Sequence, residues 1–78
     1  MLFRSNVMIV KDIGALIRQT RKAQGLRQDE LAAAANVGVR FLIELESGKE
    51  TAQIGKALSV LSALGIAIRL TPPGETKL

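Results

Sequence analysis

The sequence contains no cysteine, histidine, tryptophan or tyrosine among its 78 residues. Without cysteine, the chain can form neither a disulfide framework nor a thiolate metal site, and a reducing cytosol is the expected environment. Without cysteine or histidine, the common nucleophile–base pairs and most zinc sites are also excluded. We therefore expect no catalytic residues, no metal site and no cofactor, and an enzyme is the least favoured class of function.

The sequence also lacks a hydrophobic run long enough to cross a bilayer, which takes about 20 residues in a helix. The apolar start, MLFRSNVMIV, carries Arg4 early and has no small-residue cleavage site, so it is a poor signal peptide. The apolar segment 60–68 is interrupted by Ser62 and Gly65. We expect a cytoplasmic protein of one small domain that does not associate with membranes.

Basic residues are in excess, with eleven Lys and Arg against seven Asp and Glu, which gives a formal net charge of +4. Such a balance suits a polyanionic partner, although many small basic domains bind no nucleic acid. Charge is therefore weak evidence for DNA binding, and the helix pattern is the stronger evidence.

Helix-start and helix-stop residues predict four helices, at about residues 12–24, 28–35, 39–46 and 51–64. Asp12 is the expected N-cap of the first helix, and Gly25 ends it as a left-handed C-cap. Thr51 is the expected cap of the fourth helix, which ends at Gly65. Its apolar stripe is expected to comprise Ile54, Ala57, Leu58, Leu61 and Leu64.

The segment IAIRL alternates and is rich in isoleucine, which predicts a short strand of Ile66, Ala67, Ile68, Arg69 and Leu70. The TPPG sequence that follows can continue neither a helix nor a strand. A lone strand leaves both edges unpaired. It can pair with the NVMIV segment of its own chain or, as we favour, with its twin across the two-fold axis of a homodimer.

The junction of the second and third helices meets the requirements of a helix-turn-helix. Helices that cross steeply need a small residue at the close approach, a left-handed residue in the turn and apolar side chains that clamp the pair. Ala32 suits the close approach, and Asn36 suits the turn because its short amide tolerates the left-handed conformation. The expected clamp consists of Leu31, Val37, Leu42 and Leu45.

The third helix has two faces. At about 100° per residue, Leu42 and Leu45 form an inward stripe, whereas Arg40 and Glu44 point outward from the same turns. The plainer interpretation is a buried strut on which Arg40 and Glu44 are only solvated surface. We favour a helix that packs on one face and contacts DNA with the other.

From about Ile13 to Leu64 the chain resembles the Cro/C1-type (XRE-type) helix-turn-helix repressors, through IRQTRKAQGLRQDELA, NVGVRFLIELESGK and LSVLSALG. The resemblance implies an all-α, lambda-repressor-like four-helix DNA-binding domain with a short C-terminal β-strand that pairs across a homodimer. The implied division is an N-terminal extension, a helix-turn-helix domain, a dimerising strand and a flexible tail, at residues 1–11, 12–65, 66–71 and 72–78.

Within that family, residues 37–70 look closest to the HipB-type antitoxins, in which the fourth helix leads directly into such a strand. The partners of these antitoxins are HipA-type serine/threonine kinase toxins. Toxin and antitoxin together repress their own operon, so double-stranded DNA with a palindromic operator is the other implied partner.

The resemblance also implies which residues contact DNA. The implied base contacts are Gln28, Val39, Arg40 and Glu44, although Gln28 also suits a phosphate. The implied phosphate contacts are Arg27, Ser47, Gly48 and Lys49. Arg21 and Glu46 match a salt-bridged pair that ties the first helix to the third, which is structural on any interpretation.

Two positions depart from the family pattern. The residue before Gln28 is usually a capping Ser or Thr but is Arg27 here, and loss of such a cap costs about 1 kcal/mol. The turn residue is Asn36, where glycine is commoner. Plainer roles also remain, since Gln28 can be only a helix-start residue, and Arg27 and Lys49 can be ordinary surface cations.

The favoured function is a sequence-specific DNA-binding autorepressor that acts as the antitoxin of a HipBA-like toxin–antitoxin pair. The alternative is a free-standing XRE-type transcriptional regulator without a toxin partner, and the neighbouring gene distinguishes the two. A third possibility is a protein-only module that silences an enzyme by docking, which the absence of salt-dependent binding to its own promoter would favour.

Overall fold

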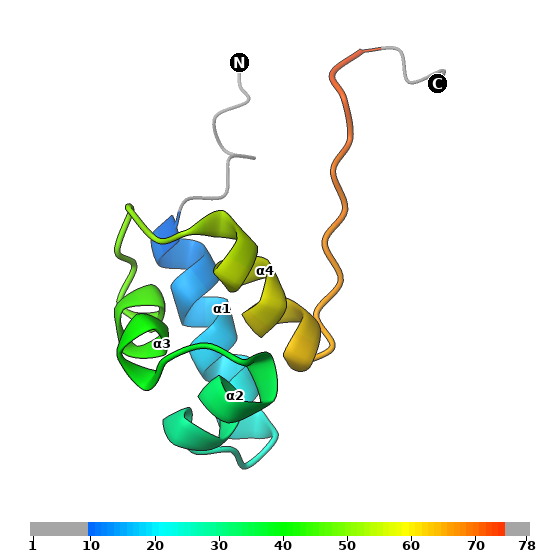
Figure 1. Ribbon diagram of the computed structural model, residues 1–78. Coiled ribbons are helices and arrows are strands. Elements are labelled where there is room, and N and C mark those ends of the chain that lie inside the picture. The colour runs from blue at the N-terminus through cyan, green and yellow to red at the C-terminus, as the bar shows by residue number, and fades with distance from the viewer. Residues whose placement is uncertain (1–9, 75–78) are drawn as a thin grey trace.

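The computed structural model describes residues 10–74, and this part of the chain contains α1 (Val10–Ala23), α2 (Gln28–Ala35), α3 (Val39–Glu46) and α4 (Ile54–Ala63). Helix α1 packs against α3, and α2 packs against both α3 and α4 (Figure 1). None of the helices in residues 10–74 has the length and apolar character needed to span a bilayer. The all-α, four-helix architecture is as predicted.

Helix α1 begins earlier than predicted. It starts at Val10, so the prediction of Asp12 as N-cap is wrong, and Asp12 lies inside the first turn. Val10 is half-buried and precedes Gly14 and Ile17 at the spacing of one inward face, so packing extends the helix backwards. The predicted stop is confirmed, because Gly25 has a φ of +73°. The N–H of the next residue, Leu26, donates to the carbonyl of Arg21 at 3.0 Å.

The turn between α2 and α3 has the predicted geometry. Asn36 adopts the left-handed conformation, with φ 59° and ψ 45°, and the N–H of Val37 donates to the carbonyl of Ala32 at 3.0 Å. Ala32 is buried where the helices approach, and Leu31 and Leu42 are fully buried on either side of the turn. The helix-turn-helix that the sequence predicts is therefore present.

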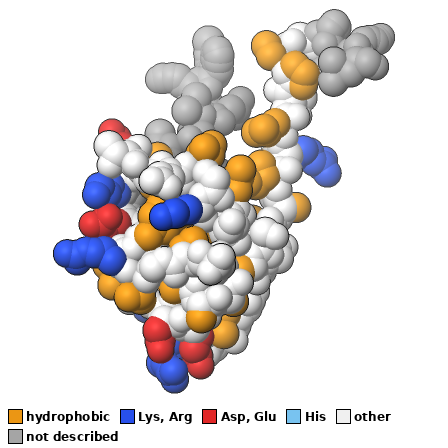
Figure 2. Space-filling model, in the orientation of Figure 1, with side chains coloured by type: hydrophobic (Ala, Val, Ile, Leu, Met, Phe, Trp, Pro, Cys, Tyr) orange, Lys and Arg blue, Asp and Glu red, His pale blue; other side chains and the backbone are white. Residues whose placement is uncertain are grey.

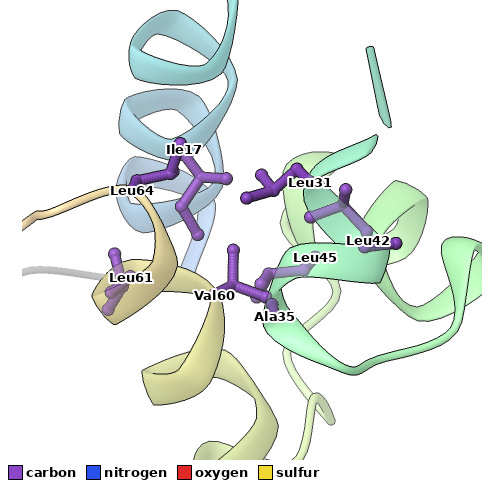
Figure 3. Packing of buried hydrophobic residues seen from close by; sticks show 9 residues of the cluster. Ile17, Leu31, Ala35, Leu42, Leu45, Val60, Leu61 and Leu64 are labelled. Atoms are coloured by element: carbon purple, nitrogen blue, oxygen red, sulfur yellow. The ribbon is translucent and has the colours of Figure 1, made fainter. Parts of the chain in front are cut away.

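The core lies where the four helices converge (Figure 3) and contains Ile17, Leu31, Ala32, Ala35, Leu42, Leu45, Val60, Leu61 and Leu64. The predicted stripe of α4 is partly wrong, because Ile54 is 75% exposed and Leu58 45% exposed, whereas Val60 is fully buried. Two apolar side chains of α4 are thus left on the surface.

The prediction that Thr51 caps α4 is also wrong. Thr51 lies in the preceding turn, where the N–H of Ala52 donates to the carbonyl of Lys49 at 3.4 Å. The N-cap position is taken by Gln53, whose carbonyl accepts the first helical bond from Ala57 and whose side chain makes no capping bond. The turn after α3 therefore uses residues that local propensity assigns to the helix.

Residues 66–74 run away from the end of α4 as an extended segment (Figure 1). The predicted strand 66–70 is not formed among the described residues, because a strand requires backbone hydrogen bonds to a neighbouring strand. The N–H of Ile66 instead donates back to the carbonyl of Leu61 at 2.9 Å and closes the end of α4, with Gly65 at φ +79° as predicted. Most of the alternative partner, NVMIV, and the last residues of the predicted tail lie outside the described residues.

Candidate nucleic-acid interface

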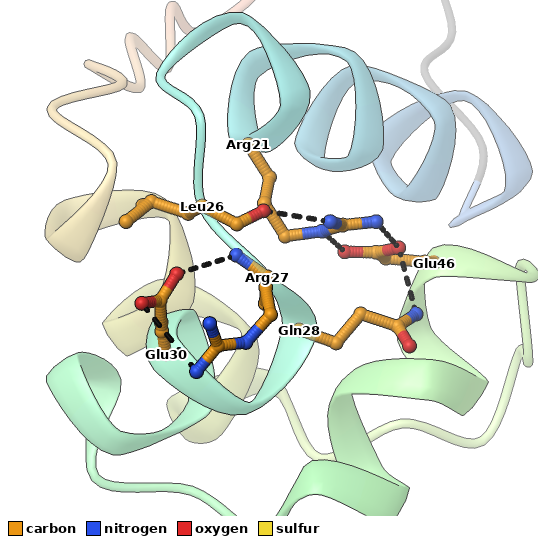
Figure 4. Close-up of polar contacts among 6 residues, drawn as sticks. All are labelled: Arg21, Leu26, Arg27, Gln28, Glu30 and Glu46. Carbon is orange, nitrogen blue, oxygen red and sulfur yellow. Dashed lines mark hydrogen bonds and ion pairs between the residues drawn. The ribbon is translucent and has the colours of Figure 1, made fainter.

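The ion pair expected between Arg21 and Glu46 joins α1 to the end of α3 (Figure 4). Arg21 Nε donates to Glu46 Oε2 at 2.7 Å and its Nη2 donates to Oε1 at 3.0 Å, while Nη1 donates to the carbonyl of Leu26 at 2.9 Å. The side chains are only 9% and 4% exposed. The hydrogen bond from the Arg21 guanidinium to Glu46 raises the pKa of Arg21. The ion pair orients α3 relative to the first two helices.

Gln28, the predicted contact at the start of α2, is part of the same network. Its Nε2 donates to Glu46 Oε1 at 3.1 Å, and its side chain is half-buried (Figure 4). Sequence reasoning missed this bond, because positions 28 and 46 are 18 residues apart and only the packing of α2 on α3 brings them together. The structure therefore connects a predicted DNA contact to a pair regarded as purely structural.

Arg27 immediately precedes α2 and pairs with two acidic side chains of the first turn of that helix. Its Nε lies 3.1 Å from Asp29 Oδ1, and its Nη2 lies 3.6 Å from Glu30 Oε2. The hydrogen bond from Arg27 lowers the pKa of Asp29 and, reciprocally, raises the pKa of Arg27. The side chain of Arg27 is 71% exposed, but these carboxylates offset much of the charge that a phosphate contact would use.

The missing Ser or Thr cap of α2 is partly replaced. Glu30 Oε1 accepts a hydrogen bond from the backbone N–H of Arg27 at 2.8 Å, which is the reciprocal half of a capping box. The guanidinium of Arg27 has only donors and cannot form the other half. Helix α2 therefore starts with one side-chain cap contributed from its third position.

The outer face of α3 is exposed and mostly apolar. Val39 and Ile43 are 43% and 47% exposed, one turn apart, and Arg40 is exposed beside them. Within the described residues the Arg40 guanidinium has no hydrogen bond or ion pair, so it is available to an external acceptor. Val39 and Arg40 thus lie on one accessible surface, together with an isoleucine that the sequence prediction did not include.

Glu44 and Lys49, predicted to contact a base and a phosphate, contact one another. Lys49 Nζ donates to Glu44 Oε1 at 3.1 Å, and both side chains are about half exposed. The pair offsets the negative charge that Glu44 would otherwise place beside DNA. A shallow depression next to it is lined by Phe41 and by Lys56, whose Nζ lies 5.7 Å from the centre of the Phe41 ring.

Ser47 and Gly48, predicted to bind phosphate, also have structural roles. Ser47 Oγ donates to the carbonyl of Glu44 at 2.9 Å at the end of α3. Gly48 has a φ of +90°, and a Cβ there would lie 3.0 Å from the Cα of Lys11. Because the turn after α3 approaches the start of α1 so closely, glycine is needed here whether or not DNA is bound.

The positive charge is not concentrated on α2, α3 and the turn that follows. Residues 27–56 contain more acidic than basic side chains, whereas α1 carries the basic residues Lys11, Arg18, Arg21 and Lys22 against Asp12 alone. Figure 2 shows basic and acidic side chains interspersed on the visible face rather than one basic field. Specific contacts, more than a strong field, therefore have to supply recognition at α3.

Comparison with known proteins agrees with this geometry. Residues 17–70, more than half of the chain, match the family described as helix-turn-helix (HTH_3). Over 66 residues the chain is 61% identical to a protein of Sinorhizobium fredii (strain NBRC 101917 / NGR234) named uncharacterized HTH-type transcriptional regulator y4mF. The match covers 85% of this chain and 87% of that relative. Proteins of this family are typically non-enzymatic. The chain belongs to the XRE-type (Cro/C1-type) helix-turn-helix family of DNA-binding transcriptional regulators.

Proposed function

We propose that this protein is a sequence-specific transcriptional repressor that places α3 in the major groove of its operator. The division of α3 by face carries the proposal. Leu42 and Leu45 are at most 1% exposed on the inner side, whereas Val39 and Arg40 are accessible on the outer side. A helix held by one face across a second helix is the arrangement that presents side chains to base edges.

The outer side chains have defined partners in this proposal. Arg40 donates to O6 and N7 of guanine, Val39 packs on a thymine methyl group, and Glu44 accepts from N4 of cytosine. Lys49 and the hydroxyl of Ser47 contact phosphate just beyond α3. Lys49 is paired with Glu44. Its ammonium group can contact a phosphate while it still offsets the negative charge of the Glu44 carboxylate.

The test measures how tightly Arg40→Ala and Arg18→Ala bind two duplexes. One is a high-affinity operator selected from random sequences, and the other is unrelated DNA. Arg40→Ala should weaken operator binding by about tenfold or more and leave binding to unrelated DNA nearly unchanged, as expected for a bidentate base contact. Arg18→Ala removes the same charge from the exposed face of α1 and should affect both duplexes equally. Equal loss on both duplexes for Arg40→Ala would exclude it as a base contact.

We further propose that the repressor is a homodimer joined by residues 66–70. Ile68 is 47% exposed and Leu70 88% exposed, and the segment continues from α4, whose Leu58 is also exposed. Positions 68 and 70 are two residues apart, the spacing that places side chains on one side of an extended chain. The orange side chains along this segment are visible in Figure 2. Antiparallel pairing with a second copy would supply the backbone partners that an exposed strand lacks.

The dimer is tested by analytical sedimentation, which compares the oligomeric state of Ile68→Lys with that of Ala67→Lys. The two positions are adjacent and point to opposite sides of an extended chain. A lysine at position 68 should give a monomer with much weaker operator binding, whereas a lysine at position 67 should leave the dimer intact. A wild-type protein that sediments as a monomer at micromolar concentration would contradict the proposal.

The toxin partner is a separate question. The resemblance of residues 37–70 to HipB-type antitoxins supports a kinase toxin as partner, whereas the relative described above is named only as a transcriptional regulator. A free-standing regulator is therefore the better supported form of the proposal. Purification from the native operon followed by mass spectrometry tests it, and stoichiometric recovery of a HipA-type kinase would establish the antitoxin instead.

A further inference from the structure

We propose that Glu46 is a positioning residue for DNA recognition, which orients the Gln28 amide so that its oxygen accepts a hydrogen bond from the exocyclic amino group of a base. The inference rests on the proposed DNA-binding function and deepens it. It assigns the outward oxygen of Gln28 to a base with an amino group in the major groove, adenine or cytosine.

The orientation of the amide follows from the chemistry of its partner. Glu46 Oε1 already accepts from Arg21 Nη2 at 3.0 Å and lies 3.1 Å from Gln28 Nε2. An ionised carboxylate only accepts hydrogen bonds, so the reverse orientation would bring two acceptor oxygens together. Figure 4 shows the Gln28 oxygen on the side of the amide that faces away from Glu46.

The anchor of the amide is rigid. Glu46 receives two hydrogen bonds from Arg21 and is 4% exposed, and Arg21 is held in turn by the carbonyl of Leu26. Gln28 is therefore fixed at its inner end by a buried ionic network, whereas a free glutamine would rotate its amide. Because the side chain is already ordered, it loses little conformational entropy when it contacts DNA. This preorganisation favours discrimination between bases.

The outward oxygen defines what Gln28 can bind. It pairs with the amino groups at N6 of adenine and N4 of cytosine, and it is repelled by O6 of guanine, O4 of thymine and phosphate oxygens. The second hydrogen on Nε2 is left for a neighbouring acceptor such as N7 of adenine. Gln28 should thus contribute sequence preference at one base pair of each half-site.

The experiment first selects a high-affinity duplex from random sequences and then removes amino groups one at a time. Each adenine is replaced by purine and each cytosine by 2-pyrimidinone, which keep the ring but lack the exocyclic amino group. At one position, replacement should cost the wild-type protein about tenfold in affinity, equivalent to about 1.4 kcal/mol. Gln28→Met, which keeps the length and apolar stem, should be insensitive at that same position.

The role of Glu46 is tested with Glu46→Gln, whose amide can face Gln28 in either orientation. This variant should lose the amino-group dependence at that position while the response to base changes opposite Arg40 persists. Because removal of one charge can unfold the domain, the wild-type protein is also tested directly. Its Gln28 side-chain amide protons should show NOEs to the Glu46 methylene protons and slowed exchange with water.

The possible outcomes distinguish a failure of the proposed DNA-binding function from a failure of the inference about Gln28 and Glu46. Failure to enrich any duplex would overturn the proposed function and this inference with it. Enrichment without a Gln28-dependent amino-group effect, or Gln28→Met binding weakened equally on operator and unrelated DNA, would overturn this inference alone. Rapidly exchanging Gln28 amide protons without NOEs to Glu46 would also overturn it, whatever the DNA results.

Discussion

Gly14 of α1 lies directly against the backbone carbonyl of Leu45 in α3, with no room for a side chain between them. A Cβ at position 14 would collide with that oxygen and would lie 2.8 Å from the carbonyl oxygen of Glu46. The contact brings α1 close enough to α3 for Arg21, about two turns further along α1, to reach Glu46. The orientation of α3 therefore depends on a glycine in the middle of a helix.

Gly14→Ala should lower the free energy of unfolding by about 1–3 kcal/mol, because overpacking outweighs the better helix propensity of alanine. Gly55→Ala is the matched control, since a Cβ in that helical position of α4 meets no atom within 4 Å. It should leave stability unchanged or raise it by up to about 1 kcal/mol. Urea unfolding measures both, and equal effects of the two substitutions would contradict the close approach at Gly14.

Arg21→Met should lower the free energy of unfolding by about 3–5 kcal/mol, because it leaves the Glu46 carboxylate buried without its ionic partner. The double variant Arg21→Met/Glu46→Met should be more stable than the sum of the single losses predicts, since no charge then remains buried. Thermal and urea unfolding of the four proteins give the coupling. Additive single effects would show that the pair does not act as a unit.

Asn36→Gly should leave the free energy of unfolding nearly unchanged, because glycine adopts the φ of 59° without strain. Asn36→Val should lower it by about 1–2 kcal/mol, since a β-branched side chain is disfavoured in the left-handed region. Chemical denaturation measures both variants. A valine variant as stable as the glycine variant would mean that the turn changes its conformation at little cost.

Lys49→Met should weaken binding to all DNA sequences by a similar factor, because a phosphate contact carries no base preference. The slope of log affinity against log salt should become shallower by about one, corresponding to one phosphate contact. Filter binding or fluorescence anisotropy at several salt concentrations measures the slope. Glu44→Gln serves as the partner control, because it frees Lys49 from its ion pair and should strengthen non-specific binding.

Asp29 should titrate below the ordinary range of an aspartate, because the hydrogen bond from Arg27 lowers its pKa. A depressed folded-state pKa means that the interaction stabilises the fold above the pKa of Asp29 in the unfolded chain. This stabilisation is lost as the pH falls through the folded-state value. Carbon-detected NMR titration of wild type and Arg27→Gln measures the shift, and identical midpoints in the two proteins would contradict the role of Arg27.

Local signals predicted most of the backbone. The predicted bounds of α2 and α3 match those of the structure. The turn at Asn36 and the helix stops at Gly25 and Gly65 each depend on one residue with a positive φ, so a single position suffices to predict them. The errors occurred where local signals compete with packing. Asp12 and Thr51 are good caps in isolation, but Val10 extends α1 inward and the turn after α3 delays α4.

Helix periodicity and turn chemistry act over a few residues, so the four helices, the joint between α2 and α3 and an outward Arg40 could all be inferred from residue types and spacing. The pairing of the polar groups could not be inferred in the same way. Gln28 shares Glu46 with Arg21. Glu44 pairs with Lys49, and Arg27 pairs with Asp29 and Glu30. Those contacts join side chains whose directions follow from how the helices pack, and hydrogen bonding depends on direction and distance. The residue types at the candidate interface were thus predictable, but the orientation of its polar groups was not.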